Sequence, residues 1–204
     1  MGSHPAPIPL EKSHIARASA MFGRAFQDDP LLVHLIPDAA WRYCAAPRVY
    51  RCVIQYGLLY GQVETTSAEV EGAAVWLPPH AAYTTIWKMF RAGLFALPIQ
   101  VGGGFVRRVL NYFEHVDHLR HQHTQFTHWY LQLLGVDPQY QRQGHAKTLL
   151  EPQLARLDRE QWPCCLDTTS ETNVAIYERF GFRIAAESQV PRTDIRVWLM
   201  TRGQ

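Results

Sequence analysis

The pattern that decides the fold lies in residues 128–150, HWYLQLLGVDPQYQRQGHAKTLL. His128 to Val136 is a mostly apolar run of strand length, which predicts a buried strand. A polar loop follows from Asp137 to Gly144. After it, apolar residues recur at the spacing of one helix face: Ala146, Leu149, Leu150, Leu154 and Leu157. The first turn of a helix presents unpaired N–H groups and partial positive charge, so a phosphate or pyrophosphate site is predicted at 141–148.

The composition indicates a globular protein with a sizeable core. The chain has 204 residues, of which 47% are hydrophobic and 19% charged. This length favours one domain, so we expect 1–204 to be a single domain, with Met1–His4 compatible with a remnant of an expression vector. The formal net charge of +2 gives no reason to expect nucleic acid as a partner.

The cysteines and the termini point to a cytoplasmic protein. Cys44, Cys52, Cys164 and Cys165 show no metal-type spacing, so we expect four buried, reduced thiols. The N-terminus has no signal-peptide pattern. Lys88 and Arg91 interrupt the apolar stretch 84–105, which excludes a membrane span there.

The rest of the chain alternates between strand and helix patterns. We expect strands at 7–12, 62–67, 72–77, 162–168, 182–187 and 195–201. We expect helices at 15–26, 31–36, 38–60, 105–123 and 173–180, and another that starts near Trp87 and ends at Pro98. Ser13 and Asp38 are the expected caps of two of them. This order predicts a mixed α/β fold with a central sheet.

Two motifs carry a resemblance to a known family. Gln141-x-x-Gly144-x-Ala146 follows the apolar strand and opens the helix, and Asn173-x-x-x-Tyr177-x-x-x-Gly181-Phe182 follows it at a fitting distance. Together they resemble the GNAT family of N-acetyltransferases. Within that family, the runs WYLQLLGVDPQYQRQG, LDTTSETN, IYERFGF and WLMTR are similar to the small-molecule acetyltransferases that modify puromycin. The stretch 81–127 shows no clear match.

The resemblance implies a fold and a co-substrate. The fold is the GNAT fold, a mostly antiparallel twisted sheet whose central strands splay apart, flanked by helices. The co-substrate is acetyl-CoA, without a metal. The residues implied to bind it are Leu134, Gly135, Val136, Gln141, Arg142, Gln143, Gly144, His145, Ala146, Lys147, Thr148, Asn173 and Tyr177.

Physical chemistry gives these residues distinct roles. Backbone N–H groups from Arg142 to Thr148 suit a pyrophosphate, and we favour ligand contact over plain solvation for the side chains of Arg142 and Lys147. Only the backbone of His145 is implicated. The resemblance implies that Leu134 and Val136 pair with the pantetheine arm as an added strand would.

The resemblance assigns the catalytic roles to two groups. The backbone N–H of Leu134 would polarise the thioester carbonyl and stabilise the oxyanion. Tyr177, protonated at neutral pH, is the expected general acid for the leaving thiolate. Asn173 lies one helical turn before Tyr177 and is implied to contact the cofactor arm. For Tyr177 the alternative is a core aromatic with a satisfied hydroxyl.

Several other residues leave two interpretations open. The general base is unidentified, and its candidates are Asp28, Asp29, Glu64 and His128, each of which also fits a surface or capping role. Core packing and an apolar acceptor pocket explain Phe26, Trp76 and Trp129 equally well. The histidines clustered along 115–128 lack the ligands of a tetrahedral metal site, so a polar helix end explains them better.

The resemblance implies an acetyl-CoA-dependent enzyme. Its acceptor is expected to be the primary amine of a small molecule, with a role in antibiotic or xenobiotic resistance. We expect direct attack in a ternary complex, 81–127 as a helical acceptor-side segment, no membrane partner, and a monomer or homodimer. The alternatives are acetylation of a protein N-terminus or lysine, and a non-catalytic acyl-CoA sensor.

Overall fold

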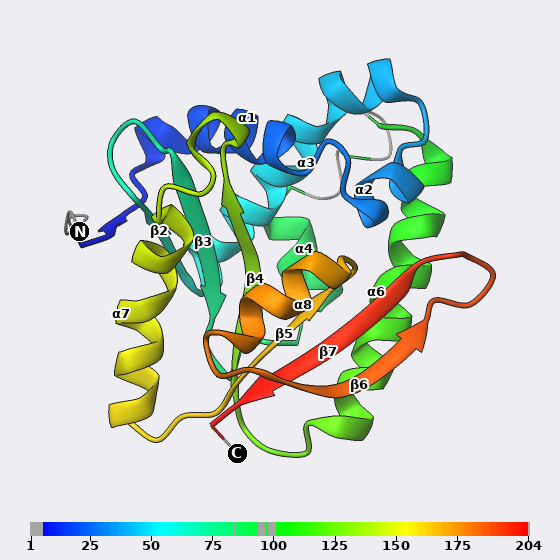
Figure 1. The fold of residues 1–204 in the computed structure, drawn as a ribbon. Coiled ribbons are helices and arrows are strands. Elements are labelled where there is room, and N and C mark those ends of the chain that lie inside the picture. Colours follow the sequence, from blue (N-terminus) through cyan, green and yellow to red (C-terminus); the bar gives the residue numbers. More distant parts are fainter. Residues whose placement is uncertain (1–5, 84, 94–96, 98–100, 204) are drawn as a thin grey trace.

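The computed structural model describes residues 6–83, 85–93, 97 and 101–203. Its centre is a seven-stranded sheet in the order β1-β2-β3-β4-β5-β7-β6 (Figure 1). The strands are β1 (Ile8–Pro9), β2 (Gln62–Thr65), β3 (Gly72–Leu77), β4 (Trp129–Val136), β5 (Cys164–Thr168), β6 (Arg183–Gln189) and β7 (Arg196–Arg202). Neighbours pair antiparallel except β4 and β5, which run parallel. The predicted mixed fold with a mostly antiparallel sheet is confirmed.

Helices cover both faces of this sheet. They are α1 (Ile15–Ala25), α2 (Pro30–Leu35), α3 (Ala39–Tyr60), α4 (Ile86–Arg91), α6 (Gly103–His123), α7 (His145–Arg159) and α8 (Glu171–Glu178), with short 3-10 turns at Lys12–His14 and Pro138–Tyr140. In β3, Ala73 and Val75 pack into the core beneath α1 and α3, whereas Ala74 and Trp76 join the core beneath α7 and α8. Figure 1 shows α7 and α8 on the near side of the sheet.

Capping side chains set the starts of α2, α3 and α4. The carboxylate of Asp38 accepts the N–H of Trp41 at 2.6 Å and begins α3, as expected. The expectation that Ser13 caps the first long helix is wrong, because His14 is the N-cap of α1. The hydroxyl of Ser13 instead donates to Glu11, 3.2 Å away, within the 3-10 turn that precedes α1. Met1–His4 and Pro98 lie outside the described residues.

The sheet opens at its centre. β4 and β5 pair at Trp129 with Cys164 and at Tyr130 with Cys165, and then diverge. The register between β3 and β4 shifts beside Trp76, which leaves Gln132 as the extra residue of a bulge. A bulge bends its strand and re-aims the side chains around it. The two halves of the sheet therefore enclose a wedge-shaped opening beyond Tyr130.

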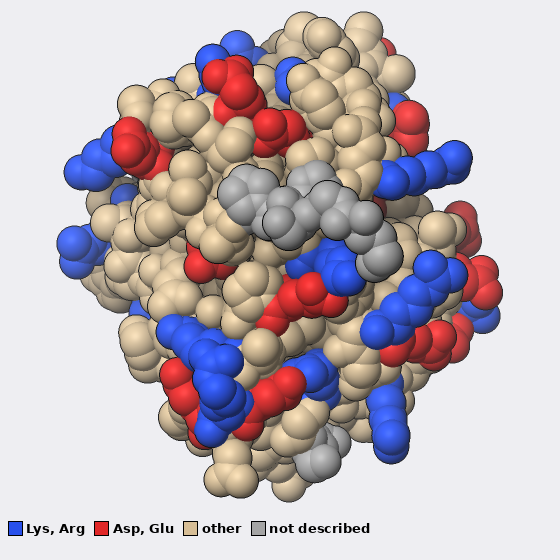
Figure 2. Space-filling view, turned by 60° about the vertical axis from the view of Figure 1, so that its left-hand side comes forward, with Lys and Arg blue, Asp and Glu red and all other residues tan. Residues whose placement is uncertain are grey.

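The surface carries mixed charge. Figure 2 shows acidic and basic side chains interspersed over one face of the molecule, in keeping with the formal net charge of +2. Among the residues that the structure describes, no helix is both long and apolar enough to cross a bilayer. The expectation of four buried thiols is wrong for Cys44, which is exposed because it lies on the outer side of α3.

Candidate active site

The loop between β4 and α7 has the backbone shape of an anion site. Arg142 and Gly144 adopt left-handed conformations, with φ of 63° and 94°, and Gly144 is the N-cap of α7. The first intrahelical bond runs from Thr148 N–H to Gly144 O at 3.0 Å, so the N–H groups of Ala146 and Lys147 precede it. No side chain among the described residues caps this helix. Gln141, Arg142, Gln143 and Gly144 are all exposed, so the loop is accessible to a ligand.

Two contacts fix the start of this loop. Asp137 is buried, accepts the N–H of Gln139 at 3.4 Å, and forms an ion pair with Arg24 of α1. The side-chain amide of Gln141 donates to the carbonyl of Val136 at 3.2 Å, which ties the loop back to β4. The side chain of Lys147 pairs with Glu151 at 3.5 Å on an exposed helix face. The loop is therefore anchored to α1 and β4, and its outward surface is available.

The edge of β4 beside the opening presents backbone N–H groups that point away from β3. The N–H of Asp137 bonds to the carbonyl of Glu71 at 2.8 Å, on the β3 side. Because backbone direction alternates along a strand, the N–H groups of Leu134 and Val136 face away from β3, toward the opening. Gly135 lies between them, and a Cβ there would come within 2.7 Å of the ring of Phe22. Close packing of α1 on β4 therefore explains this glycine.

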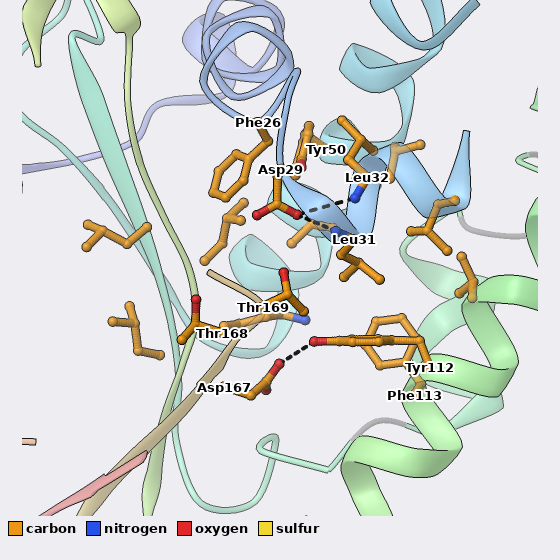
Figure 3. A pocket seen from close by; sticks show the side chains of 18 of the residues that line it. Phe26, Asp29, Leu31, Leu32, Tyr50, Tyr112, Phe113, Asp167, Thr168 and Thr169 are labelled. Atoms are coloured by element: carbon orange, nitrogen blue, oxygen red, sulfur yellow. Dashed lines mark hydrogen bonds between the residues drawn. The ribbon is translucent and has the colours of Figure 1, made fainter. Parts of the chain in front are cut away.

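A cavity of about 200 Å³ lies at the opening. Because β4 and β5 diverge, side chains from both faces of the sheet meet in it. Phe26, Asp29, Leu31, Leu32, Tyr50, Phe105, Tyr112 and Phe113 come from α1 to α3 and α6, and Asn173 and Tyr177 come from α8 on the opposite face. Figure 3 shows the aromatic and acidic side chains turned toward this space. Leu97 and α6 bring the segment 81–127 into the cavity wall.

Tyr177 and Asn173 line the same cavity, one helical turn apart on α8. Tyr177 is buried and packs edge-on against Phe182, with ring centroids 5.9 Å apart. Gly181, at φ 82°, ends this helical segment. Its N–H donates to the carbonyl of Glu178, and the N–H of Phe182 donates to the carbonyl of Tyr177. Burial raises the pKa of Tyr177, and the negative charges of Asp167 and Asp29 raise it further. Its hydroxyl therefore stays protonated at neutral pH.

Two carboxylates line the cavity. Asp29 caps α2 by accepting the N–H of Leu31 at 3.0 Å and that of Leu32 at 3.3 Å, and burial raises its pKa. Asp167 accepts the hydroxyls of Tyr112, at 2.6 Å, and of Tyr130. The sequence interpretation included Asp29 among the possible bases but missed Asp167. Asp167 stands two residues after Cys165 in a buried strand, and a charged residue in such a strand was the signal that could have identified it.

The other candidate bases lie elsewhere. His128 is buried, with Nδ1 2.7 Å from the carbonyl of Phe126, and Glu64 lies on β2. Asp28 is exposed. None of the three is among the residues that line the described cavity. Of the aromatic candidates, Phe26 lines it, whereas Trp76 and Trp129 belong to the core beneath α7 and α8.

The cysteines beside the opening are poor nucleophiles. Cys164 and Cys165 are buried in the cores on opposite faces of the sheet, as their adjacency predicts. Burial raises the pKa of Cys165 to about 12 and that of Cys164 well above its ordinary value. Both thiols are therefore protonated at neutral pH, which favours direct transfer over an acyl-cysteine. Among the described residues, no group of three or more His, Cys, Asp or Glu could hold a metal ion.

Comparison with known proteins agrees with this geometry. The family model of the acetyltransferase (GNAT) domain matches residues 100–184. This match, together with the motifs and the fold, confirms the resemblance to the GNAT family and the expectation of an acyltransferase.

The individual proteins that the chain resembles share low sequence identity with it. An uncharacterized N-acetyltransferase of Schizosaccharomyces pombe is 25% identical over 181 residues, which are 85% of this chain and 72% of the relative. A Corynebacterium glutamicum structure described as histone acetyltransferase HPA2 and related acetyltransferase has a TM-score of 0.64 at 18% identity, covering 98% of this chain and 96% of that one. Arylalkylamine N-acetyltransferase 2 of Aedes aegypti has a TM-score of 0.57 at 14% identity, covering 96% and 97%. These structural likenesses concern the fold.

Proposed function

We propose that this acyltransferase moves the acetyl group of acetyl-CoA to the primary amine of a small molecule. The observation that carries the proposal is the cavity at the splayed strands, which is lined both by residues of β4 and by Tyr177. An acceptor amine in this cavity would meet a thioester lying along β4.

The donor side fits the chemistry of acetyl-CoA. Its pyrophosphate suits the left-handed loop and the first turn of α7, where backbone N–H groups of Ala146 and Lys147 face outward. Its amide-bearing arm suits the edge of β4, where Leu134 and Val136 direct N–H groups into the opening. Asn173 stands at the cavity end of this path. The bound group supplies the activated acetyl.

Three groups of this chain would serve the transfer. The N–H of Leu134 would donate to the acetyl oxygen and stabilise the negative charge that develops there. The amine nitrogen forms the new C–N bond as the C–S bond breaks, and Tyr177 would give its proton to the departing sulfur. Asp29, whose pKa burial raises, lines the cavity and can accept the proton of the attacking amine. From an ammonium substrate, the products are an amide, a thiol and one released proton.

The size of the cavity favours a small acceptor over a protein. A protein N-terminus or lysine would require a groove for the flanking peptide, whereas the described cavity has a volume of about 200 Å³ and α2 and α6, which contact each other, both contribute to its wall. A sensor without catalysis would not require a buried, protonated Tyr177. A role in antibiotic resistance rests on the likeness of the sequence to puromycin-modifying enzymes.

A thiol-release assay with acetyl-CoA tests the proposal. The panel should hold small primary amines, puromycin among them, and peptides with a free N-terminus or an internal lysine. We expect release with small amines and little with peptides. Release with peptides only would replace the small-molecule assignment, and tight acetyl-CoA binding without any release would favour the sensor.

A further inference from the structure

Some hydrogen-bond acceptors in the cavity receive fewer hydrogen bonds from the protein than they can accept. The carboxylate of Asp167 is held from two sides, because Tyr112 on α6 donates to one oxygen and Tyr130 on β4 to the other. Each carboxylate oxygen can accept more than one hydrogen bond, so capacity remains. Among the described residues, no Lys, Arg or His nitrogen forms an ion pair with Asp167 or Asp29.

A third acceptor stands in the same cavity. Gln132, the bulge residue of β4, lines the cavity, and its Oε1 is buried without a hydrogen-bond donor. A buried acceptor without a donor costs free energy unless a ligand supplies one. An alkylammonium carries three N–H donors and one positive charge. It matches two carboxylates and an amide oxygen better than a neutral or anionic group does.

The nearby cation does not satisfy Asp167. Arg120 is buried behind Tyr130, with its guanidinium 4.1 Å from the centre of that ring. Its nitrogens bond to the carbonyl of Ala82 at 2.8 Å and to Asp117 at 3.3 Å. Arg120 therefore forms no ion pair with Asp167 and acts on it only through its electrostatic field, whereas the hydroxyl of Tyr130 donates to the carboxylate directly.

The rest of the wall is apolar and combines aliphatic with aromatic side chains. Phe26, Tyr50 and Phe113 are turned toward the cavity (Figure 3), and Phe105 lines it together with leucines and valines of α2, α3 and α6. Such a surface gains free energy by covering a hydrophobic body and would leave the polar groups of a sugar or polyamine unpaired.

We infer that the acceptor is a hydrophobic, preferably aromatic, primary amine whose ammonium group binds Asp167, with Tyr112 and Tyr130 as positioning residues for that carboxylate. The inference rests on the proposed function and adds the acceptor class and its anchoring residue. Asp167 recognises the cation, and the side-chain oxygen of Gln132 in the same cavity is available to a further N–H group. The apolar wall thus selects the hydrophobic part of the substrate, and Asp167 selects its ammonium group.

The test compares Asp167→Asn with a matched change, Asp117→Asn, at a half-buried acid that contacts Arg120 but does not line the described cavity. The acceptors are phenethylamine, a cation at neutral pH; aniline, which is neutral; and putrescine, which lacks an apolar body. Isothermal calorimetry measures acceptor binding directly, and thiol release measures kcat and KM.

We expect Asp167→Asn to weaken phenethylamine binding roughly tenfold to a hundredfold, the loss typical of a charge-assisted hydrogen bond. Aniline binding and the KM of acetyl-CoA should change less than about threefold, and Asp117→Asn, which leaves the Asp167 carboxylate in place, should change phenethylamine binding less than about threefold. Equal losses for phenethylamine and aniline, or a raised KM of acetyl-CoA, would mean that Asp167 is structural.

The remaining outcomes separate this inference from the proposed function. Preference for putrescine over phenethylamine would overturn the inference and leave small-amine acetylation intact. Absence of turnover with every amine would overturn the proposed function. Calorimetry would still decide whether Asp167 binds an aromatic ammonium.

Discussion

Tyr177 has two properties that a general acid at neutral pH requires. It lies within a cavity wall beside the edge of β4, and burial with the charges of Asp167 and Asp29 raises its pKa. The proton is therefore present in the resting enzyme and is available when negative charge develops on the departing sulfur. The same burial makes the residue look like a core aromatic, so a kinetic experiment must separate the two interpretations.

Tyr177→Phe removes the hydroxyl and keeps the ring that packs on Phe182. We expect kcat to fall by roughly 10²-fold or more, the usual contribution of acid catalysis, while the KM of acetyl-CoA changes little. Tyr56→Phe is the control, because Tyr56 is equally buried and donates to Ala81 O at 3.3 Å. Wild-type turnover in Tyr177→Phe would remove the general-acid role.

The pH profile gives a second measure of Tyr177. A raised pKa keeps the acid protonated above its ordinary value of about 10, so the wild type should lose no turnover from this group between pH 7 and about 10. Turnover should be followed over that range by thiol release with saturating substrates. A falling alkaline limb below about pH 9.5 that disappears in Tyr177→Phe would contradict the raised pKa.

The loop and α7 act as one element. Gly144 must hold a left-handed conformation for the chain to turn from β4 into the helix with its first N–H groups outward. Asp137 and Gln141 fix the beginning of the loop, so strain at Gly144 would be felt where the pyrophosphate is expected. The cavity is lined by residues 130–134 of β4, which precede the loop, and should respond less.

Gly144→Ala places a Cβ on a residue with φ of 94°, which costs roughly 1 kcal/mol and shifts the loop. We expect the KM of acetyl-CoA to rise about tenfold, with kcat at saturation nearly unchanged. Gly102→Ala is a matched control, because Gly102 is also a helix N-cap, with φ of 102° and, among the described residues, no heavy atom within 4 Å of the position that a Cβ would take. Equal changes in both variants would indicate general destabilisation.

Elements with strong local periodicity were predictable from the sequence. The strand, loop and helix predicted for 128–150 appear as β4, the loop after it and α7. The conformation of each depends on residues within one turn or one strand. The cavity was not predictable, since Asp29, Tyr112 and Asp167 come from three distant segments and meet only through the opening between β4 and β5. Ser13 failed as a cap because it lies inside the 3-10 turn that precedes α1, so that His14 takes the N-cap position.

At the scale of the whole molecule, the sheet has two halves that are joined by a short region of strand pairing. β1 to β4 form one half and β5 to β7 the other, and the strands at the join pair through two residues each. A ligand in the opening would contact β4 on one side and α8 on the other, and its pyrophosphate would reach α7. Acetyl-CoA should therefore stabilise the entire fold, beyond the loop that it touches.

Thermal unfolding measures this coupling. At a concentration 100 times its Kd, acetyl-CoA should add about 2.7 kcal/mol to the free energy of unfolding, which for 204 residues raises Tm by roughly 5–10 °C. The acetyl thioester of N-acetylcysteamine lacks the pyrophosphate, so at the same concentration it should raise Tm far less. Gly144→Ala should reduce the acetyl-CoA shift, whereas Gly102→Ala should keep it. Equal shifts from both thioesters would show that the loop of 141–148 contributes nothing to binding, because the strand edge alone would then carry the affinity.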